Sequence, residues 1–422
     1  MRLVNNIVSP YGLAGISYVF FLIACAIPPS IYSHYMGEPD LMFLNTQIIL
    51  FYSLCVFAFL FGAWFVSYIF PSSYAPRTID ARIPVNAFLL VPLVVGMSVT
   101  TVSILLLIRG NSNIVLLLLA QQGGDLKHAV AFDAGGNFTF APLMLIAIIW
   151  WAYWRSGDLR DRIRWPLRIA FPLALLLVVI SSVLTLSRNL VMVASMGLII
   201  LGLSRRAFQG ALDIKIILKT GTTAVILVGL LFFGFSFLRG IENWDAQISQ
   251  LFGYTLVSYN RLAAVMNGTL CYPYSGSGIY ISPFVAFNHS FNRLIPLASY
   301  FNWPDHLDVW NSEFAAVSDA GLDARLIWSG AFGDLFSDLG WFAPAVLLGY
   351  GLWAGFAWRL LKRGMALGVV LYPCIGFCVL FWIGSNYLLD SDPFVVYVIA
   401  ILLAFYERCF LNKIPLSRTS ES

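Results

Sequence analysis

Ten long apolar runs constrain the fold of this 422-residue chain more than any other feature. About 20 apolar residues in an α-helix cross the roughly 30 Å of hydrocarbon in a bilayer. The runs lie at 11–32, 44–70, 86–108, 138–154, 166–187, 189–204, 220–238, 340–358, 366–387 and 394–411. Those at 138–154 and 189–204 are short. The sequence therefore predicts an all-α polytopic membrane protein with about 10 transmembrane helices, within a range of about 10 to 12.

The composition excludes several other classes of protein. Mean hydropathy is +0.81 and only 11% of the residues are charged, which excludes a disordered chain and a soluble enzyme with one anchor. The net charge of +4 indicates membrane topology rather than nucleic-acid binding. The six cysteines form no CxxC pair and mostly lie in apolar runs, so we expect neither a disulfide framework nor a cysteine zinc site. The first run lacks a cleavage site before it ends, and we expect it to be retained as a helix.

The distribution of basic residues predicts the orientation of the helices. Lysine and arginine resist translocation and therefore gather on the cytoplasmic side of a membrane. With the N-terminus inside, 18 of the 25 basic residues face the cytoplasm. The other seven face outward, together with 15 of the 21 acidic residues and all four histidines. The sequence therefore predicts that both termini are cytoplasmic.

One long segment, 239–339, separates the seventh and eighth predicted helices and would face outward. Such a long loop between tightly connected helices is unusual, and long loops commonly carry function. Its many aromatic residues predict that it packs, and apolar residues at helical spacing over 246–266 predict that it is partly helical. The expected organisation is transmembrane helices 1–7 with short loops over 1–238, this large loop, transmembrane helices 8–10 over 340–411, and a cytoplasmic tail over 412–422.

Short motifs lie where the predicted helices meet the outer face and within the long loop. They are Leu186-Ser187-Arg188-Asn189, Leu238-Arg239-Gly240, Tyr259-Asn260-Arg261 and Gly333-Asp334-Leu335-Phe336-Ser337-Asp338-Leu339-Gly340. With these motifs and one long outer loop late in the chain, nearly the whole sequence resembles the Wzy-type O-antigen polymerases, the bacterial oligosaccharide repeat-unit polymerases.

This resemblance implies a GT-C-like fold with one large, partly helical periplasmic loop, in the bacterial inner (cytoplasmic) membrane. It implies an inverting glycosyltransferase that polymerises undecaprenyl-diphosphate-linked oligosaccharide repeat units into O-antigen or a related surface polysaccharide. The implied partners are that lipid-linked oligosaccharide, membrane lipids and a chain-length regulator protein, with no nucleic acid. Two alternatives stay open: an O-antigen ligase-like glycan transferase, and a lipid-linked saccharide transporter or flippase. A flippase would need polar residues deep inside its helices, and these are rare here.

The implied leaving group is a lipid diphosphate, whose charge must be held at the membrane surface. Arginine suits this role because its planar, permanently charged guanidinium meets two phosphate oxygens at once. The residues expected to bind the substrate and its diphosphate are Arg188, Arg239, Arg261, Arg293, Arg325 and Tyr259. The alternative for a helix-end arginine is an anchor among lipid headgroups. Arg188 is favoured because it lies in an almost uncharged turn.

The acceptor hydroxyl needs a proton acceptor, which a carboxylate or an imidazole can supply. The candidate catalytic residues are Asp334, Asp338, His289 and Glu313, with His306 as a further histidine. Asp334 and Asp338 are four residues apart, so on a helix they share a face, and their like charges would raise the pKa of one of them. The alternative for both aspartates is solvation or helix capping, and for His289 it is ordinary hydrogen bonding.

Two acidic pairs offer the oxygen ligands that Mg²⁺ or Mn²⁺ prefers, Glu38-Pro39-Asp40 and Asp390-Ser391-Asp392. An acid-x-acid pattern alone is weakly specific. The outer arginines also provide a way to neutralise a diphosphate without a metal. We therefore expect no metal site and no cofactor.

We predict that a cysteine introduced at position 306, in a cysteine-free background, reacts with a membrane-impermeant maleimide in cells whose outer membrane alone is opened. The asymmetry of the basic residues places this position outside the inner membrane. A cysteine at position 206, on the expected cytoplasmic side, is the control and should stay unlabelled. Labelling at position 306 only after the inner membrane is permeabilised would contradict the orientation.

Overall fold

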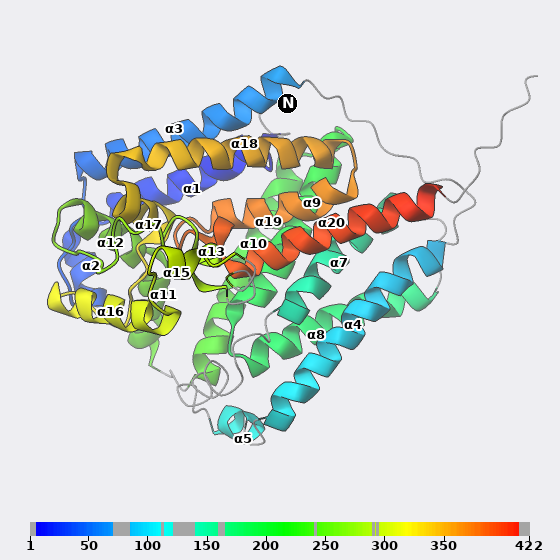
Figure 1. Ribbon diagram of the computed structural model, residues 1–422, viewed down its shortest axis with the longest axis horizontal. Coiled ribbons are helices and arrows are strands. Elements are labelled where there is room, and N and C mark those ends of the chain that lie inside the picture. Colours follow the sequence, from blue (N-terminus) through cyan, green and yellow to red (C-terminus); the bar gives the residue numbers. More distant parts are fainter. Residues whose placement is uncertain are drawn as a thin grey trace, which may run out of the picture. The chain divides into compact units, whose positions relative to one another are not determined.

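A computed structural model of the chain describes residues 6–70, 85–110, 114–120, 140–158, 165–239, 243–288, 292 and 295–412. Within these residues the regular secondary structure is helical and contains no strand (Figure 1). A helix satisfies its backbone donors and acceptors internally, as a hydrocarbon environment requires. The expectation of an all-α, multi-pass membrane protein is confirmed.

The chain divides into two compact units, each built from segments that are far apart in the sequence. Unit 1 comprises Met1–Pro71, Gln209–Phe356 and Ile375–Phe394, and unit 2 comprises Ser72–Phe208, Ala357–Cys374 and Val395–Ser422. The helices of unit 1 are α1 (Pro10–Cys25), α2 (Pro29–Met36), α3 (Thr46–Ile69), α10 (Ile214–Leu238), α11 (Trp244–Thr255), α12 (Val257–Met266), α13 (Pro283–Phe287), α15 (Leu297–Tyr300), α16 (His306–Asp319), α17 (Gly330–Leu339) and the 3-10 turns η5 (Gly340–Phe342) and η6 (Tyr387–Leu389). Those of unit 2 are α4 (Val85–Gly110), α5 (Ile114–Leu119), α7 (Phe140–Asp158), α8 (Trp165–Leu184) and α9 (Arg188–Phe208). Three helices contribute residues to both units, namely α18 (Ala343–Lys362), α19 (Ala366–Leu380) and α20 (Ser391–Asn412).

Among the described residues, seven helices are long and apolar enough to cross a membrane. They span Thr46–Ile69, Ala87–Gly110, Trp165–Leu184, Arg188–Phe208, Ile214–Leu238, Gly330–Lys362 and Ser391–Phe410. The number rises to eight if α1 and α2, which meet at an angle of 91°, form one broken span. This count is lower than the ten spans expected from the sequence, although a helix occupies all or part of each predicted run.

The runs that differ from a simple span do so for local reasons. The run at 11–32 bends at Pro28 and Pro29, since proline lacks the N–H that would continue the helix. The run at 366–387 is helical only as far as Leu380. The run at 138–154 forms α7, which is less apolar because it carries tryptophans and an arginine in its later turns.

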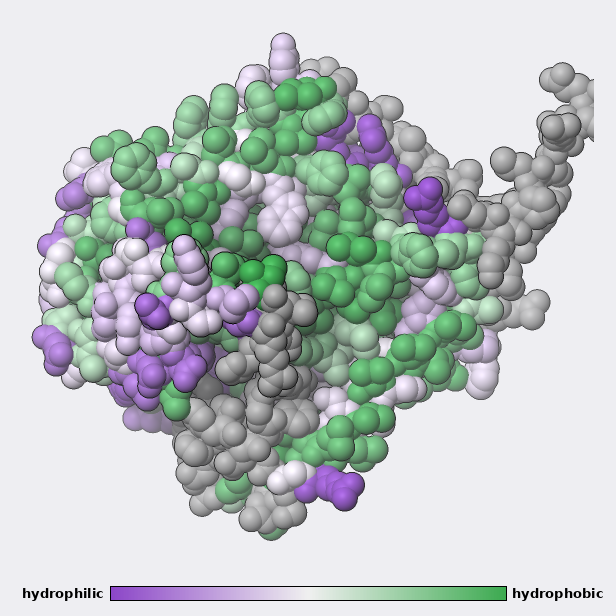
Figure 2. All heavy atoms as spheres, in the orientation of Figure 1, coloured by the Kyte–Doolittle hydropathy of each residue, from purple (hydrophilic) through white to green (hydrophobic). Residues whose placement is uncertain are grey.

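Glycines let α3 and α18 pack backbone against backbone in unit 1. A Cβ atom added at Gly62 would lie 2.3 Å from the carbonyl oxygen of Leu348, and one added at Gly351 would lie 2.0 Å from that of Phe59. Small residues favour helix association in membranes because they allow this close approach. Figure 2 shows apolar residues over these two helices and hydrophilic residues gathered over α16 of the same unit.

A buried ion pair joins α7 to the later part of α20 in unit 2. Arg155 Nε lies 2.5 Å from Glu407 Oε1, and Arg155 Nη2 donates to Glu407 Oε2 at 2.7 Å. Trp151 Nε1 also donates to this carboxylate at 2.7 Å, and Gly364 accepts from Arg155 through its carbonyl oxygen at 2.8 Å. Because both charges are paired and hydrogen-bonded, their burial is compatible with a membrane protein.

The described residues of the long segment after α10 form several short helices, from α11 to α17. α12 lies against α17 and is buried along most of its length. Tyr272 and Tyr280 belong to a hydrophobic cluster with Val317 and Ile327. The aromatic residues of this segment therefore form part of a packed core, as their number in the sequence predicts.

A second buried ion pair ties the segment after α2 to α12 in unit 1. Arg261 donates to both carboxylate oxygens of Glu38, at 2.7 and 2.9 Å, and the two side chains are 0% and 2% exposed. Glu38 also accepts from Tyr32 Oη at 2.6 Å, from Asn260 Nδ2 at 3.0 Å and from the Asp323 backbone N–H at 2.8 Å. Burial alone would raise the pKa of Glu38, but the Arg261 guanidinium and the other donors outweigh it, so the pKa is lowered.

We predict that Glu38→Gln lowers the free energy of unfolding by about 3 to 5 kcal/mol, because it leaves the Arg261 guanidinium buried without a counter-charge. Arg325→Ala, which removes the pair between the exposed Arg325 and Asp323, should cost at most about 1 kcal/mol. The thermal unfolding midpoint of the detergent-purified protein measures both effects.

The pH dependence gives a second readout for the same pair. Since the pKa of Glu38 is lowered in the folded protein, its contribution is present above the unfolded pKa of about 4.3 and is lost as pH falls through the folded value. The difference between wild type and Glu38→Gln should therefore shrink in acid. Equal losses for Glu38→Gln and Arg325→Ala at neutral pH would contradict the buried-pair interpretation.

Candidate functional site

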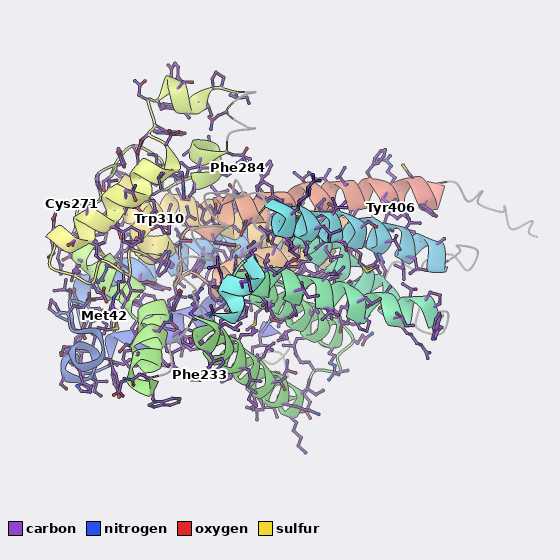
Figure 3. The ribbon with its side chains drawn as sticks, turned by 90° about the horizontal axis from the view of Figure 1, so that it is seen from below. Met42, Phe233, Cys271, Phe284, Trp310 and Tyr406 are labelled. Atoms are coloured by element: carbon purple, nitrogen blue, oxygen red, sulfur yellow. The ribbon has the colours of Figure 1, made fainter. Side chains whose placement is uncertain are left out.

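The strongest cluster of chemically capable side chains lies in unit 1, where α16 and α17 meet the loop between α12 and α13. It contains Tyr280 from the loop, Glu313 from α16, and Asp334 and Asp338 from α17. Trp310 of α16 and Phe284 of α13, both labelled in Figure 3, belong to the elements around it.

Asp338 fixes the backbone of the loop that carries Tyr280. One carboxylate oxygen accepts from the N–H groups of Gly276 and Gly278 at 3.0 and 3.2 Å, and the other accepts from Tyr280 and Ile281 at 2.8 and 3.0 Å. Gly276 and Gly278 have φ angles of +81° and +85°, which favour glycine. Four backbone donors occupy this carboxylate, so its role is to position the loop.

Asp334 connects α17 to the irregular chain between α19 and α20. Its carboxylate accepts from the Ser329 hydroxyl at 2.7 Å and from the Asn386 backbone N–H at 2.8 Å. The Asn386 side-chain amide donates in turn to the carbonyl oxygens of Tyr280 and Ile281 at 2.9 and 3.0 Å. The loop is therefore held from two sides, by Asp338 and by Asn386.

Glu313 and Tyr280 lie close enough to influence each other's pKa. Tyr280 is 8% exposed, and its buried hydroxyl has no partner at hydrogen-bond distance among the described residues. Burial, followed by the nearby Glu313 carboxylate, raises the pKa of this phenol above its usual range. Burial raises the pKa of Glu313 to about 7 against an opposing effect of the Tyr280 hydroxyl, and the charge of Asp334 adds a smaller upward effect.

A carboxyl group that titrates near neutral pH can take up and release a proton under physiological conditions. Glu313 has this property, and a phenol hydroxyl that can donate a hydrogen bond lies beside it. The pair can therefore activate a bound hydroxyl group. Glu313 was a candidate from the sequence, but Tyr280 and Asn386 were not, because no local pattern marks a tyrosine or asparagine that only tertiary contacts bring to the site.

The arginines expected to bind diphosphate lie in different surroundings. Arg239 follows the end of α10, and its Nη1 is 3.3 Å from the Tyr254 hydroxyl, whose ring lies 5.3 Å from that of Trp328. Arg325 is 85% exposed and pairs with Asp323 at 2.7 Å. Arg188 begins α9 in unit 2 and is 9% exposed.

Two further candidates, Arg261 and Tyr259, are buried in unit 1. Arg261 is committed to Glu38, as described above, and its guanidinium is fully buried. Tyr259 is 3% exposed and packs edge-on against Phe21, with ring centroids 5.3 Å apart. Both therefore support the fold of unit 1. His289 and Arg293 lie outside the described residues.

The acidic pairs weighed as metal ligands are engaged with protein donors. Glu38 is paired with Arg261, and Asp40 accepts from the backbone N–H groups of Met42 and Phe43 at 2.9 and 3.1 Å. Asp392 accepts from the Tyr387 hydroxyl, and Asp390 accepts from the Ser391 N–H. Within the described part of the chain, no group of three or more histidine, cysteine or acidic side chains could hold a metal ion.

No protein-family model, curated protein or solved structure matches this chain. Any function assigned to this chain therefore rests on its residues and on their geometry.

Proposed function

We propose that this protein is an integral-membrane inverting glycosyltransferase. In this proposal it polymerises undecaprenyl-diphosphate-linked oligosaccharide repeat units into a surface polysaccharide at the periplasmic face of a bacterial inner membrane. The observation that carries the proposal is the Glu313 carboxyl group, whose pKa is raised to about 7 beside the buried Tyr280 hydroxyl. A group with this pKa is well suited to act as a general base at neutral pH.

The proposed reaction is a single displacement at the anomeric carbon of the donor sugar. A hydroxyl group of the acceptor sugar attacks this carbon and loses its proton to Glu313. The bond from the anomeric carbon to the diphosphate oxygen breaks, and the lipid diphosphate leaves with the electron pair. Tyr280 donates a hydrogen bond that orients the acceptor oxygen. Asp338 and Asn386 act as positioning residues, because they hold the loop that carries Tyr280.

Arg239 is the proposed partner of the leaving diphosphate in unit 1. It follows a membrane-spanning helix on the side that is expected to disfavour basic residues, which suggests an anionic ligand. Its guanidinium contacts the hydroxyl of Tyr254, whose ring packs against Trp328, and a planar guanidinium can meet two phosphate oxygens at once. Arg188, at the start of α9, is the second candidate for this role.

We predict that Glu313→Gln lowers the rate of polymer formation by about 100-fold or more, as expected for loss of a general base. In the wild type, kcat/KM should rise as pH increases through about 7, because the base must be ionised. The assay uses the purified protein in liposomes with lipid-linked repeat units. Asp319→Asn, at the exposed end of the same helix, is the matched control.

Two results would contradict this proposal. One is a Glu313→Gln variant with the wild-type rate and pH profile. The other is transfer of finished glycan to a lipid A core acceptor with no extension of lipid-linked repeat units, which would identify a ligase.

We predict that Arg239→Ala reduces polymer formation by about 30-fold to 1000-fold at normal membrane abundance, because a charge-assisted contact to the leaving group is lost. Arg239→Lys should rescue only part of the activity, since lysine restores the charge but not the two-pronged geometry. The length ladder of lipid-linked glycan provides the readout. Arg206→Ala, at an exposed helix end on the expected cytoplasmic side, is the control. A normal ladder from Arg239→Ala would make Arg239 a headgroup anchor and leave Arg188 as the candidate.

A further inference from the structure

An exposed group of aromatic rings lies next to the candidate site in unit 1. Tyr300, at the end of α15, is 79% exposed, and Phe301 is 54% exposed. The ring centroids of Tyr300 and Phe301 are 5.1 Å apart, and those of Phe301 and Trp303 are also 5.1 Å apart with an interplanar angle of 22°. We call these three residues the aromatic platform. The short helix α15 stands at the top left of Figure 3.

Contacts to the rest of unit 1 hold the aromatic platform in place. Trp303 Nε1 donates to the carbonyl oxygen of Ser277 at 2.9 Å, and its ring packs against a core that contains Ile279 and Val309. The Trp303 backbone N–H donates to the Ala298 carbonyl oxygen at 2.8 Å, which closes the turn after α15. Exposed rings held in a fixed arrangement indicate a binding surface, because water solvates them poorly.

The same loop connects the aromatic platform to the candidate base. Ser277 and Ile279, which contact Trp303, immediately precede Tyr280, and Asp338 holds this stretch of backbone. On α16, Val309 packs with Trp303 and lies one helical turn before Glu313, a rise of about 6 Å. The aromatic platform is therefore linked to Glu313 through this loop and through one turn of α16.

The neighbouring charges indicate which ligand the aromatic platform fits. Asp305 and Asp308 are exposed at the start of α16, directly after Trp303 in the chain. Carboxylates accept hydrogen bonds from sugar hydroxyls, and the flat C–H face of a sugar ring packs on an aromatic ring. The same negative charges oppose contact with an anionic lipid surface, which attracts basic residues instead. The chemistry therefore favours a saccharide over the membrane.

We infer that Tyr300, Phe301 and Trp303 form a saccharide-binding subsite that holds the acceptor glycan so that its terminal hydroxyl reaches Glu313. This inference rests on the proposed function. It concerns the acceptor side of the proposed reaction, whereas Arg239 is the proposed partner of the leaving diphosphate.

The test measures the KM for the acceptor in variants that remove the rings of Tyr300 and Phe301 and in a variant that keeps them. We predict that the double variant Tyr300→Leu/Phe301→Leu raises the KM for the acceptor by about tenfold or more while kcat changes by less than about twofold, because ring contacts that aid only binding are lost. The double variant Tyr300→Phe/Phe301→Tyr keeps both rings and should retain the wild-type KM. Phe342→Leu, which is also highly exposed in unit 1, is the matched control.

A binding measurement separates this inference from the proposed function. The probe is the water-soluble oligosaccharide released by mild acid from lipid-linked repeat units, added to the full-length protein in nanodiscs. Saturation-transfer NMR should show contact with its sugar protons in the wild type and in Glu313→Gln, and a loss in the leucine double variant. If binding is lost with the rings but Glu313→Gln stays fully active, the subsite stands and the proposed catalytic role fails.

Two outcomes would overturn the subsite itself. One is unchanged probe binding and acceptor KM in the leucine double variant while Glu313→Gln is inactive. The other combines two measurements. The leucine double variant keeps the wild-type acceptor KM, and a charged variant, Tyr300→Asp or Phe301→Asp, associates more weakly with the membrane. The second result would assign the rings to the lipid interface, since leucine preserves insertion and aspartate does not.

Discussion

The Glu38–Arg261 ion pair is the interaction on which the arrangement of the candidate site depends. A charge removed from water costs several kcal/mol unless its hydrogen bonds are replaced, and here both groups are fully surrounded by partners. The two residues are 223 positions apart, and the guanidinium also binds the carbonyl oxygens of Asp323 and Leu326. One contact therefore joins the segment after α2, the buried helix α12 and the chain that leads into α17.

The acidic residues near α17 illustrate how partners decide the role of a carboxylate. Asp338 receives four backbone N–H groups and organises a loop, whereas Asp334 receives one hydroxyl and one N–H and connects two parts of the chain. Glu313 lacks such donors and interacts with a phenol, so burial raises its pKa to about 7. All three side chains end in a carboxyl group, and the donors around each one decide whether it organises a loop, connects two segments or interacts with a phenol.

The polar chemistry of unit 1 is concentrated in the segments between its apolar helices. α3 and α18 contact each other through glycines, so their backbones approach closely without polar groups. The loop that carries Tyr280 and the rings around Trp303 share one set of contacts, through Ser277 and Ile279. The rings around Trp303 and the helix that carries Glu313 are therefore linked through this loop.

The sequence alone determined the all-helical membrane class, because the length and hydropathy of each run depend on local composition. It also identified Glu313 and Asp338 among its candidate acids, yet it could not separate their roles. Arg261 was a plausible phosphate ligand by type and became a buried structural cation only through Glu38, a partner far away in the chain. Tyr280 and Asn386 carried no local signal at all. Tertiary structure decided these points because burial and hydrogen-bond partners arise from contacts between distant segments, which local patterns do not encode.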